Sequence, residues 1–301
     1  MTTSLLVLAA TMGNRYGGLK YPEGIGPNGE TVLDYSIYDA VKAGFKKIVF
    51  VVSKYFEEDF KNKISDKYQN VVDLAFVYQD VDLVAEEKRN PKRTHLWGSA
   101  QAVLMGKDAI DGPFGVINAV NFYQRESFEI LYHELQKLDS CGNEHILVSY
   151  RLANVLPESG GANRGICKLD ENNYLKSVID HPGVERISGN PMFLNELNKW
   201  VQLDEDAFVS MNMWGFSPSI FELIEQDFNT FIDQNGMDLK AFFTIPDFIN
   251  GMIEKQDGIV KCCETSAVWM GVVSPDDKIQ TIFRINEAIR KGIYPQKLFE
   301  K

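Results

Sequence analysis

The sequence contains 301 residues, of which 45% are hydrophobic and 24% charged, a composition typical of a soluble globular chain with one large or two modest domains. It excludes a disordered chain, a collagen and a coiled coil. Apolar runs such as 5–10 and 48–52 are much shorter than the ~20 residues that a membrane-spanning helix needs. Since no basic segment precedes the first apolar run, we expect no secretory signal, no membrane partner and a cytoplasmic protein.

Charge and cysteine spacing narrow the classes of partner. The chain has 31 Lys and Arg residues against 42 Asp and Glu residues, a net charge of −11. This excess repels phosphate backbones, so we expect no nucleic-acid partner and only a local site for an anion. Cys141, Cys167, Cys262 and Cys263 have neither CxxC spacing nor a neighbouring histidine pattern, which predicts reduced thiols and no zinc or redox motif.

The first 140 residues alternate predicted strands with predicted helices. Short apolar runs predict buried strands at 4–10, 47–52, 71–78 and 113–118. Apolar residues at helical spacing predict helices at 32–43, 55–68, 98–107 and 126–138. This order favours an α/β fold: a Rossmann-like, open and mostly parallel mixed sheet with helices on both faces.

The rest of the chain mixes shorter strands with further helices. We predict strands at 146–153, 163–169, 174–180, 208–216, 259–265 and 268–273, and helices at 219–233, 244–254 and 277–291. No linker or repeat separates the two parts. We therefore expect a single domain, 1–301, whose halves 1–140 and 141–301 share one sheet.

The segment after the first strand, LAATMGNRYGGLK at 8–20, concentrates glycine and positive charge. Glycines at 13, 17 and 18 allow a ligand to approach the backbone closely, while Arg15 and Lys20 supply fixed positive charge. The segment predicts a phosphate-binding loop, with a solvated surface loop as the alternative. Its glycine spacing fits neither the dinucleotide motif GxGxxG nor the P-loop GxxxxGK[ST].

The same segment belongs to a series of blocks that resembles the sugar-1-phosphate nucleotidyltransferase family, the enzymes of nucleotide-sugar biosynthesis. The resemblance spans nearly the whole chain in the right order. It is carried by the residues at 8–20, 26–30, 33–37, 97–102 (WGSAQA), 116–123 (VINAVNFY), 210–216 (SMNMWGF) and 269–272 (WMGV).

The resemblance implies an activity and a set of site residues. The implied reaction joins a nucleoside triphosphate to a sugar 1-phosphate, giving a nucleoside diphosphate sugar and pyrophosphate; a homo-oligomer remains open. Arg15 and Lys20 would be catalytic. The implied substrate-binding residues are Gly13, Gly98, Ser99, Ala100, Asn118, Asn121, Arg164, Gly165, Asp180, Asn212 and Trp214.

The family also implies Mg²⁺, and the sequence departs from the family at the metal ligands. Val120 stands where the first carboxylate is expected, and Gly271 stands where many relatives place the second. Asp276 and Asp277, a few residues further on, are the alternative substitute ligands, of which we predict Asp277. Thr11 replaces a glycine of the first loop, and a β-branched residue would resist a positive φ there. Two readings stay open: an active transferase with altered metal ligation, or a degenerate member that binds a nucleotide or sugar phosphate in a regulatory or structural role.

Other polar and aromatic residues have simpler interpretations. We expect His95 to be solvated, and Asp80 and Asp82 to lie on a solvated loop. Phe242, Phe243 and Phe248 predict core packing. No Ser-His-Asp or Cys-His set can be assembled, and the remaining histidines form no metal-binding pattern.

Overall fold

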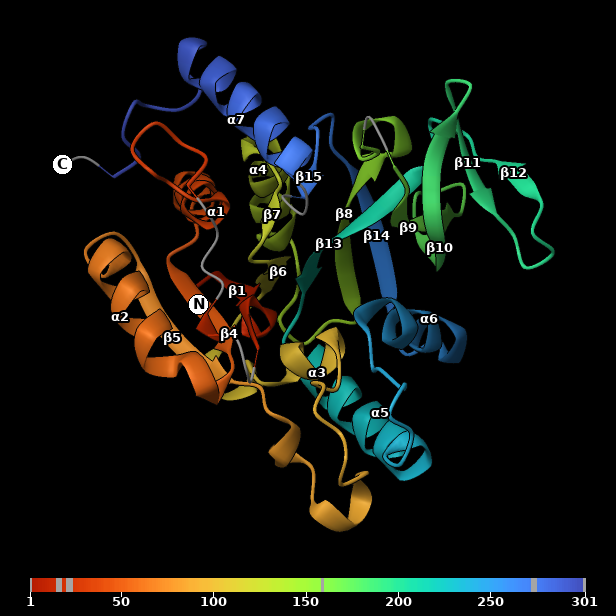
Figure 1. Cartoon of the computed structure of the whole chain (residues 1–301). Coiled ribbons are helices and arrows are strands. Elements are labelled where there is room, and N and C mark those ends of the chain that lie inside the picture. Colours follow the sequence, from red (N-terminus) through yellow and green to blue (C-terminus); the bar gives the residue numbers. More distant parts are fainter. Residues whose placement is uncertain (1, 15–17, 20–23, 158–159, 272–274, 300–301) are drawn as a thin grey trace.

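A computed structural model describes residues 2–14, 18–19, 24–157, 160–271 and 275–299. Figure 1 shows a central sheet flanked by helices, with an arm of strands at one side. Among the described residues, no helix has both the length and the apolar character that crossing a bilayer requires.

The central sheet has a parallel and an antiparallel part. Its main path runs β12-β11-β10-β9-β13-β6-β1-β4-β5, and β8 joins β13 to β14. The pairs around β1, β4, β5 and β6 are parallel, as is β8 with β14, whereas β13 and β9 to β12 pair antiparallel. The strands of this sheet are β1 (Ser4–Leu8), β4 (Lys47–Val52), β5 (Asp73–Tyr78), β6 (Phe114–Asn118), β8 (Glu144–Arg151), β9 (Ala162–Leu169), β10 (Leu175–Ile187), β11 (Asn190–Leu194), β12 (Trp200–Gln202), β13 (Phe208–Phe216) and β14 (Ile259–Glu264). Two separate pairs are β2 (Gly13–Asn14) with β3 (Gly18–Leu19), and β7 (Asn121–Phe122) with β15 (Met270–Gly271).

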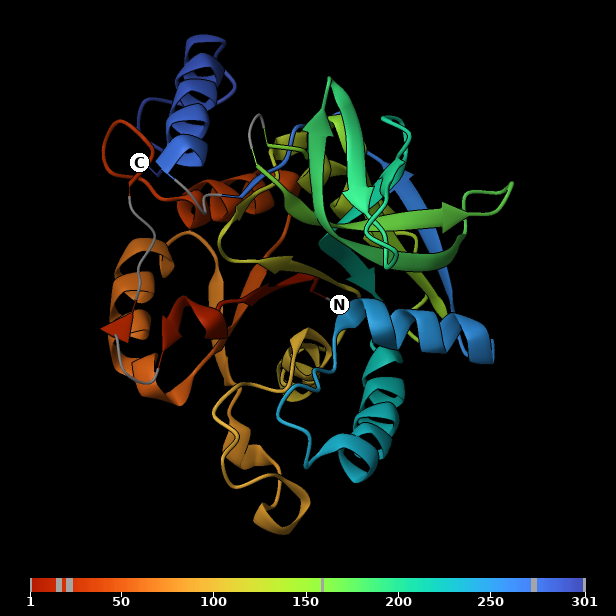
Figure 2. The same cartoon turned by 45° about the vertical axis from the view of Figure 1, so that its right-hand side comes forward.

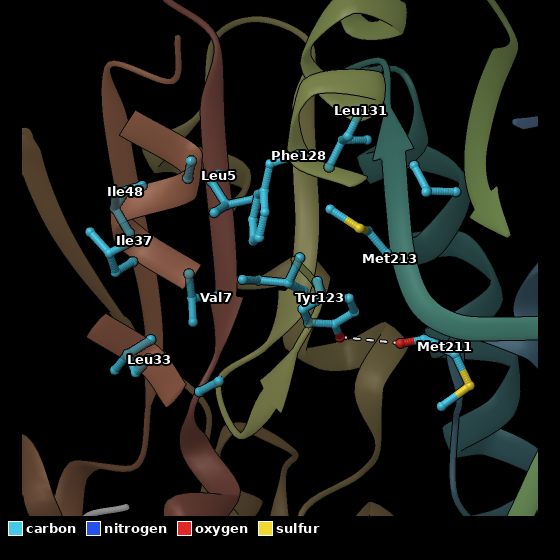
Figure 3. Packing of buried hydrophobic residues seen from close by; sticks show 14 of the residues in the cluster. Leu5, Val7, Leu33, Ile37, Ile48, Tyr123, Phe128, Leu131, Met211 and Met213 are labelled. Carbon is cyan, nitrogen blue, oxygen red and sulfur yellow. Dashed lines mark hydrogen bonds between the residues drawn. The ribbon is translucent and has the colours of Figure 1, made fainter. Parts of the chain in front are cut away.

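Helices cover both faces of this sheet. Along β1, Leu5 and Val7 point to one core while Leu6 points to the other, as the two-residue period of a strand requires. The first core packs on α1, α2 and α4, and Figure 3 labels its residues from α1 and α4. The second core packs on α3, α5 and α6. The helices are α1 (Val32–Ala43), α2 (Glu57–Tyr68), α3 (Ser99–Leu104), α4 (Arg125–Leu135), α5 (Ile220–Asn235), α6 (Ile245–Lys255) and α7 (Pro275–Arg290).

Helix α1 shows how the local sequence fixes an element. Thr31 and Asp34 form a reciprocal capping box, in which the Thr31 hydroxyl accepts from Asp34 N and the Asp34 carboxylate accepts from Thr31 N. The helix ends at Gly44, whose φ of 122° favours glycine. Helix α7 and the segment after it then cover α1 and β7 through a third cluster that includes Tyr35 and Tyr294.

The predicted fold class and the order of predicted elements are confirmed. The bounds of 32–43, 47–52 and 208–216 agree with α1, β4 and β13. The prediction missed β11 and β12, which extend the antiparallel part as an arm (Figure 2). It also ended the strand at 174–180 too early, because β10 continues to Ile187 through irregular pairing with β9.

Candidate functional site

The carboxyl ends of the parallel strands open into a cavity of about 660 Å³, the strand-end cavity. Ser53 follows β4, Gln79 follows β5, Asn118 ends β6, and Thr11 lies in the 3₁₀ turn Ala10–Met12 just after β1; all four residues line the cavity. Ligands of open α/β sheets bind at this edge, so the cavity lies where the fold favours a binding site. Gln79 was missed by the sequence analysis, although its position after a predicted strand was a signal for it.

Gly98 shapes one wall of the strand-end cavity. Its φ is 124°, and a Cβ atom there would lie 2.3 Å from the Phe243 carbonyl oxygen, so only glycine fits. Gln79 Nε2 donates to Gly98 O (2.8 Å) and to Gln101 Oε1 (2.6 Å). Of the predicted residues in this turn, Gly98 and Ser99 line the cavity, whereas Ala100 is buried and its N–H donates to Phe243 O.

The outer wall of the cavity differs from the sequence-based expectation. Phe243 and Phe248 pack in the core as predicted, but Phe242 is 46% exposed and lines the cavity, so its prediction is wrong. Its ring centroid lies 6.4 Å from that of His95, which is exposed as expected and also lines the cavity. Asp82 is exposed, whereas Asp80 is buried at the cavity wall, because its carboxylate caps the 3₁₀ turn that follows β5.

A second cavity of about 350 Å³, the amide cavity, is bounded by β9, β10, β13 and the start of α6. Among the described residues, its wall is rich in groups that hydrogen-bond to hydroxyls and contains one carboxylate, Asp180. Burial and the nearby Asp247 carboxylate raise the pKa of Asp180. The polar lining residues are Ser99, Asn118, Asn121, Asn163, Asp180, Ser210, Asn212 and Thr244; Gly165 also lines the cavity, and a Cβ there would meet Val178 at 2.9 Å.

Tyr123 fixes the boundary between β6, β7 and β13. Its buried hydroxyl accepts from Asn118 N (3.1 Å) and Asn121 Nδ2 (3.3 Å) and donates to Met211 O (3.1 Å), the bond drawn in Figure 3. Burial raises the pKa of Tyr123 to about 12, so the hydroxyl keeps its proton at neutral pH. Tyr123 therefore positions two of the predicted site residues, a role for which the sequence carried no separate signal.

Arg164 and Trp214 lie behind the cavities. The Arg164 guanidinium is buried and donates to Val155 O and Asn163 O, and its burial lowers the pKa to about 10. Trp214 is fully buried, and its indole N–H donates to Asn212 Oδ1. Neither residue lines a cavity, so any effect on a ligand passes through a neighbour.

Part of the predicted phosphate loop lies outside the described residues, including Arg15 and Lys20. Gly13 lies in β2, which pairs antiparallel with β3. Thr11 precedes this pair in the 3₁₀ turn Ala10–Met12, and its φ is not in the left-handed region. The backbone here accepts a β-branched residue, so the expected conflict with a positive φ does not arise.

The described side chains do not form a Mg²⁺ site of the kind that the family implies. Val120 lines the strand-end cavity and is 41% exposed, and a valine offers no ligand oxygen. No three His, Cys, Asp or Glu residues of the described ranges cluster as metal ligands. Asp277 is half-buried on α7 and lies outside both cavity walls.

Comparison with known proteins agrees with this architecture. The structure of the inositol-1-phosphate CTP transferase from T. maritima matches with a TM-score of 0.58 at 14% identity, over 95% of this chain and 97% of that one. A UDP-glucose pyrophosphorylase solved with UDP-glucose matches with a TM-score of 0.62 at 14% identity, over 95% and 99% of the two chains. No protein of curated function matches the sequence at a significant level. The family model described as "Nucleotidyl transferase" matches residues 24–277, so the chain belongs to the nucleotidyltransferase family.

Proposed function

We propose that the chain transfers a nucleotidyl group from a nucleoside triphosphate to a sugar 1-phosphate. The nucleotide occupies the strand-end cavity and the sugar phosphate occupies the amide cavity. An oxygen of the sugar phosphate attacks the α-phosphorus and forms a new P–O bond, while the bond to the β-phosphate breaks and releases pyrophosphate. In such a reaction the protein contributes mainly positioning and charge stabilisation.

The observation that supports this proposal is that the two cavities share a wall. Ser99 and Asn118 line both of them. Two ligands bound on either side of these residues would meet there, as an in-line transfer between two substrates requires. The amide and hydroxyl groups of the second cavity suit a polyhydroxylated ring, because each ring hydroxyl both donates and accepts a hydrogen bond.

A second candidate function is binding of these ligands without turnover. The observation that favours it is Val120, which faces the nucleotide side of the site where the family implies a carboxylate. Such a protein would bind a ligand in each cavity and would not catalyse the transfer. Its role would then be regulatory or structural.

The two candidates differ in the release of pyrophosphate. We would mix the purified chain with each common nucleoside triphosphate and with glucose 1-phosphate or inositol 1-phosphate, the sugar and polyol esters related to the two similar structures. Release with one pair, dependent on both substrates, is the expected result. Binding of both ligands with no release under any metal condition would favour the second candidate, and no binding would contradict both.

Variants then assign each substrate to its cavity. Gln79→Leu should raise the KM for the triphosphate about tenfold and leave the KM for the sugar phosphate unchanged, since Gln79 lines only the strand-end cavity. Asp180→Asn should raise the KM for the sugar phosphate and leave the KM for the triphosphate unchanged, since Asp180 lines only the amide cavity. Asn172→Leu, in an exposed turn, is the control. Equal effects of both cavity variants on both KM values would contradict the assignment.

A further inference from the structure

The shared wall contains a chain of hydrogen bonds whose direction is fixed by chemistry. Trp214 Nε1 lies 2.9 Å from the side chain of Asn212, and an indole N–H can only donate. The Asn212 atom that faces it must therefore be the oxygen. The Asn212 nitrogen then faces Asn118, 2.8 Å away, and the Asn118 atom that accepts its hydrogen must be Oδ1.

The backbone conformation of Asn212 and a hydrogen bond to the backbone of Asn118 hold these two residues in place. Asn212 has a φ of 62°, in the left-handed region, at a point where the pairing of β13 with β8 is interrupted between Ser210 and Trp214. Asn118 is fixed at its own N–H by the Tyr123 hydroxyl. After glycine, asparagine is among the residues that most readily adopt this conformation, so Asn212 suits the break in the strand pairing.

The hydrogen bond from Asn212 determines which end of the Asn118 amide faces the cavities. Because Oδ1 is engaged by Asn212, the amide presents its Nδ2 hydrogens to the two cavities that Asn118 lines. Ser99 lines the same two cavities, and its Oγ accepts from Ile245 N (2.9 Å), which leaves the hydroxyl hydrogen to donate. The shared wall thus offers two neutral donors, the Asn118 amide and the Ser99 hydroxyl, to a ligand in either cavity.

We propose that this donor pair, the Ser99 hydroxyl and the Asn118 amide, binds a phosphoryl oxygen of the nucleotide, and that Trp214 and Asn212 are positioning residues that keep the Asn118 amide in its donor orientation. This inference rests on the proposed function, since it places the α-phosphoryl group at the wall between the cavities. Neutral donors bind an anionic oxygen more strongly than a neutral one. The assignment also gives the fully buried Trp214 a role without contact to substrate.

The test separates the phosphate from the rest of the ligand. For uridine, cytidine, thymidine, adenosine and guanosine, we would measure the Kd of the nucleoside and of its 5′-triphosphate by calorimetry, with competition for weak ligands. The Kd of the nucleoside divided by the Kd of its triphosphate gives the affinity that the phosphates add. Asn118→Leu should lower this ratio about tenfold and leave nucleoside binding unchanged. Trp214→Phe should lower this ratio about threefold. Without the indole donor, the side-chain amides of Asn212 and Asn118 can rotate and exchange their oxygen and nitrogen positions.

Controls distinguish this role from a loss of packing. Trp200→Phe and Asn172→Leu make the same changes at exposed positions and should leave the ratio unchanged. Asn118→Asp keeps the shape of the side chain and replaces donor by acceptor, so it should lower the ratio even if Asn118→Leu does not fold. Asn212→Leu should shift the indole ¹⁵N–¹H resonance of Trp214, identified by its loss in Trp214→Phe.

The outcomes are distinct. A ratio that is unchanged in Asn118→Leu and Asn118→Asp, or nucleoside affinity that falls by the same factor, would overturn the donor assignment while leaving the proposed function intact. An unmoved Trp214 indole resonance in Asn212→Leu would overturn the positioning role. If no triphosphate binds the wild-type chain, the proposed function and this inference both fail.

Discussion

The Arg93 guanidinium carbon lies 3.7 Å from the ring centroid of Trp97, so a buried cation stacks on a buried indole beside the strand-end cavity. The guanidinium also donates to the carbonyl oxygens of His95, Leu96, Asp238 and Ala241. It therefore ties the segment after β5 to the segment before α6, which together carry the outer cavity wall. Burial lowers the pKa of Arg93.

Arg93→Met should destabilise the fold by about 3 kcal/mol, because it leaves several carbonyl groups of two segments without a donor. Chemical denaturation measures this change. Arg186→Met, at a more exposed arginine paired with Glu205, should cost less than about 1 kcal/mol. Similar losses in the two variants would contradict the role of Arg93.

His145 should make the fold sensitive to acid. It is fully buried, Nδ1 accepts from Ser217 N, and burial lowers its pKa to about 4. Since the unfolded chain binds this proton near pH 6.5, the free energy of unfolding should fall by about 3 kcal/mol between pH 7 and pH 4. His145→Asn keeps an acceptor and does not titrate, so it should remove this part of the loss.

The comparison of wild type with His145→Asn isolates that histidine. Burial raises the pKa of Asp39 to about 7, which acts in the opposite direction, because the folded chain then binds a proton that the unfolded chain has released. Asp39 is present in both proteins and cancels from the difference. Parallel stability curves between pH 4 and pH 7 would contradict the prediction.

The sequence predicted the parallel half of the fold well, because hydrophobic period and helix ends are local signals. Ser99, Asn118 and Asn121, which the family resemblance named as substrate-binding, line the cavities, and their binding role stays a prediction. The sequence could not separate Phe242 from Phe243, since their exposure depends on contacts with distant segments. Nor could it show that the Trp214 indole donates to Asn212 from a buried position, because the pairing of β13 with β8 is interrupted there.

Arg15 and Lys20 lie outside the described residues, and their predicted role rests on charge and sequence position. A bound triphosphate at 100 times its Kd should stabilise the fold by about 2.7 kcal/mol and raise the melting temperature. Arg15→Ala combined with Lys20→Ala should abolish this shift. Arg186→Ala with Lys199→Ala removes the same charge elsewhere and should retain it; equal shifts in both double variants would contradict the phosphate role.

Val120→Asp should make nucleotide binding dependent on Mg²⁺ and increase pyrophosphate release on the order of 100-fold, because it places a carboxylate at the wall of the strand-end cavity. Val120→Asn, which adds a similar side chain without charge, should give neither effect. The measurement is pyrophosphate release with and without Mg²⁺, with melting curves to check folding. A folded Val120→Asp that releases pyrophosphate no faster than wild type would contradict the prediction and favour another metal ligand, such as Asp277.

The most direct test of the two-cavity assignment is a crystal structure of the chain with the nucleoside triphosphate that binds it most tightly. We expect the nucleoside in the strand-end cavity, within hydrogen-bond reach of Gln79, and the α-phosphate at Ser99 and Asn118. A nucleotide bound elsewhere, or one that occupies the amide cavity alone, would contradict the assignment.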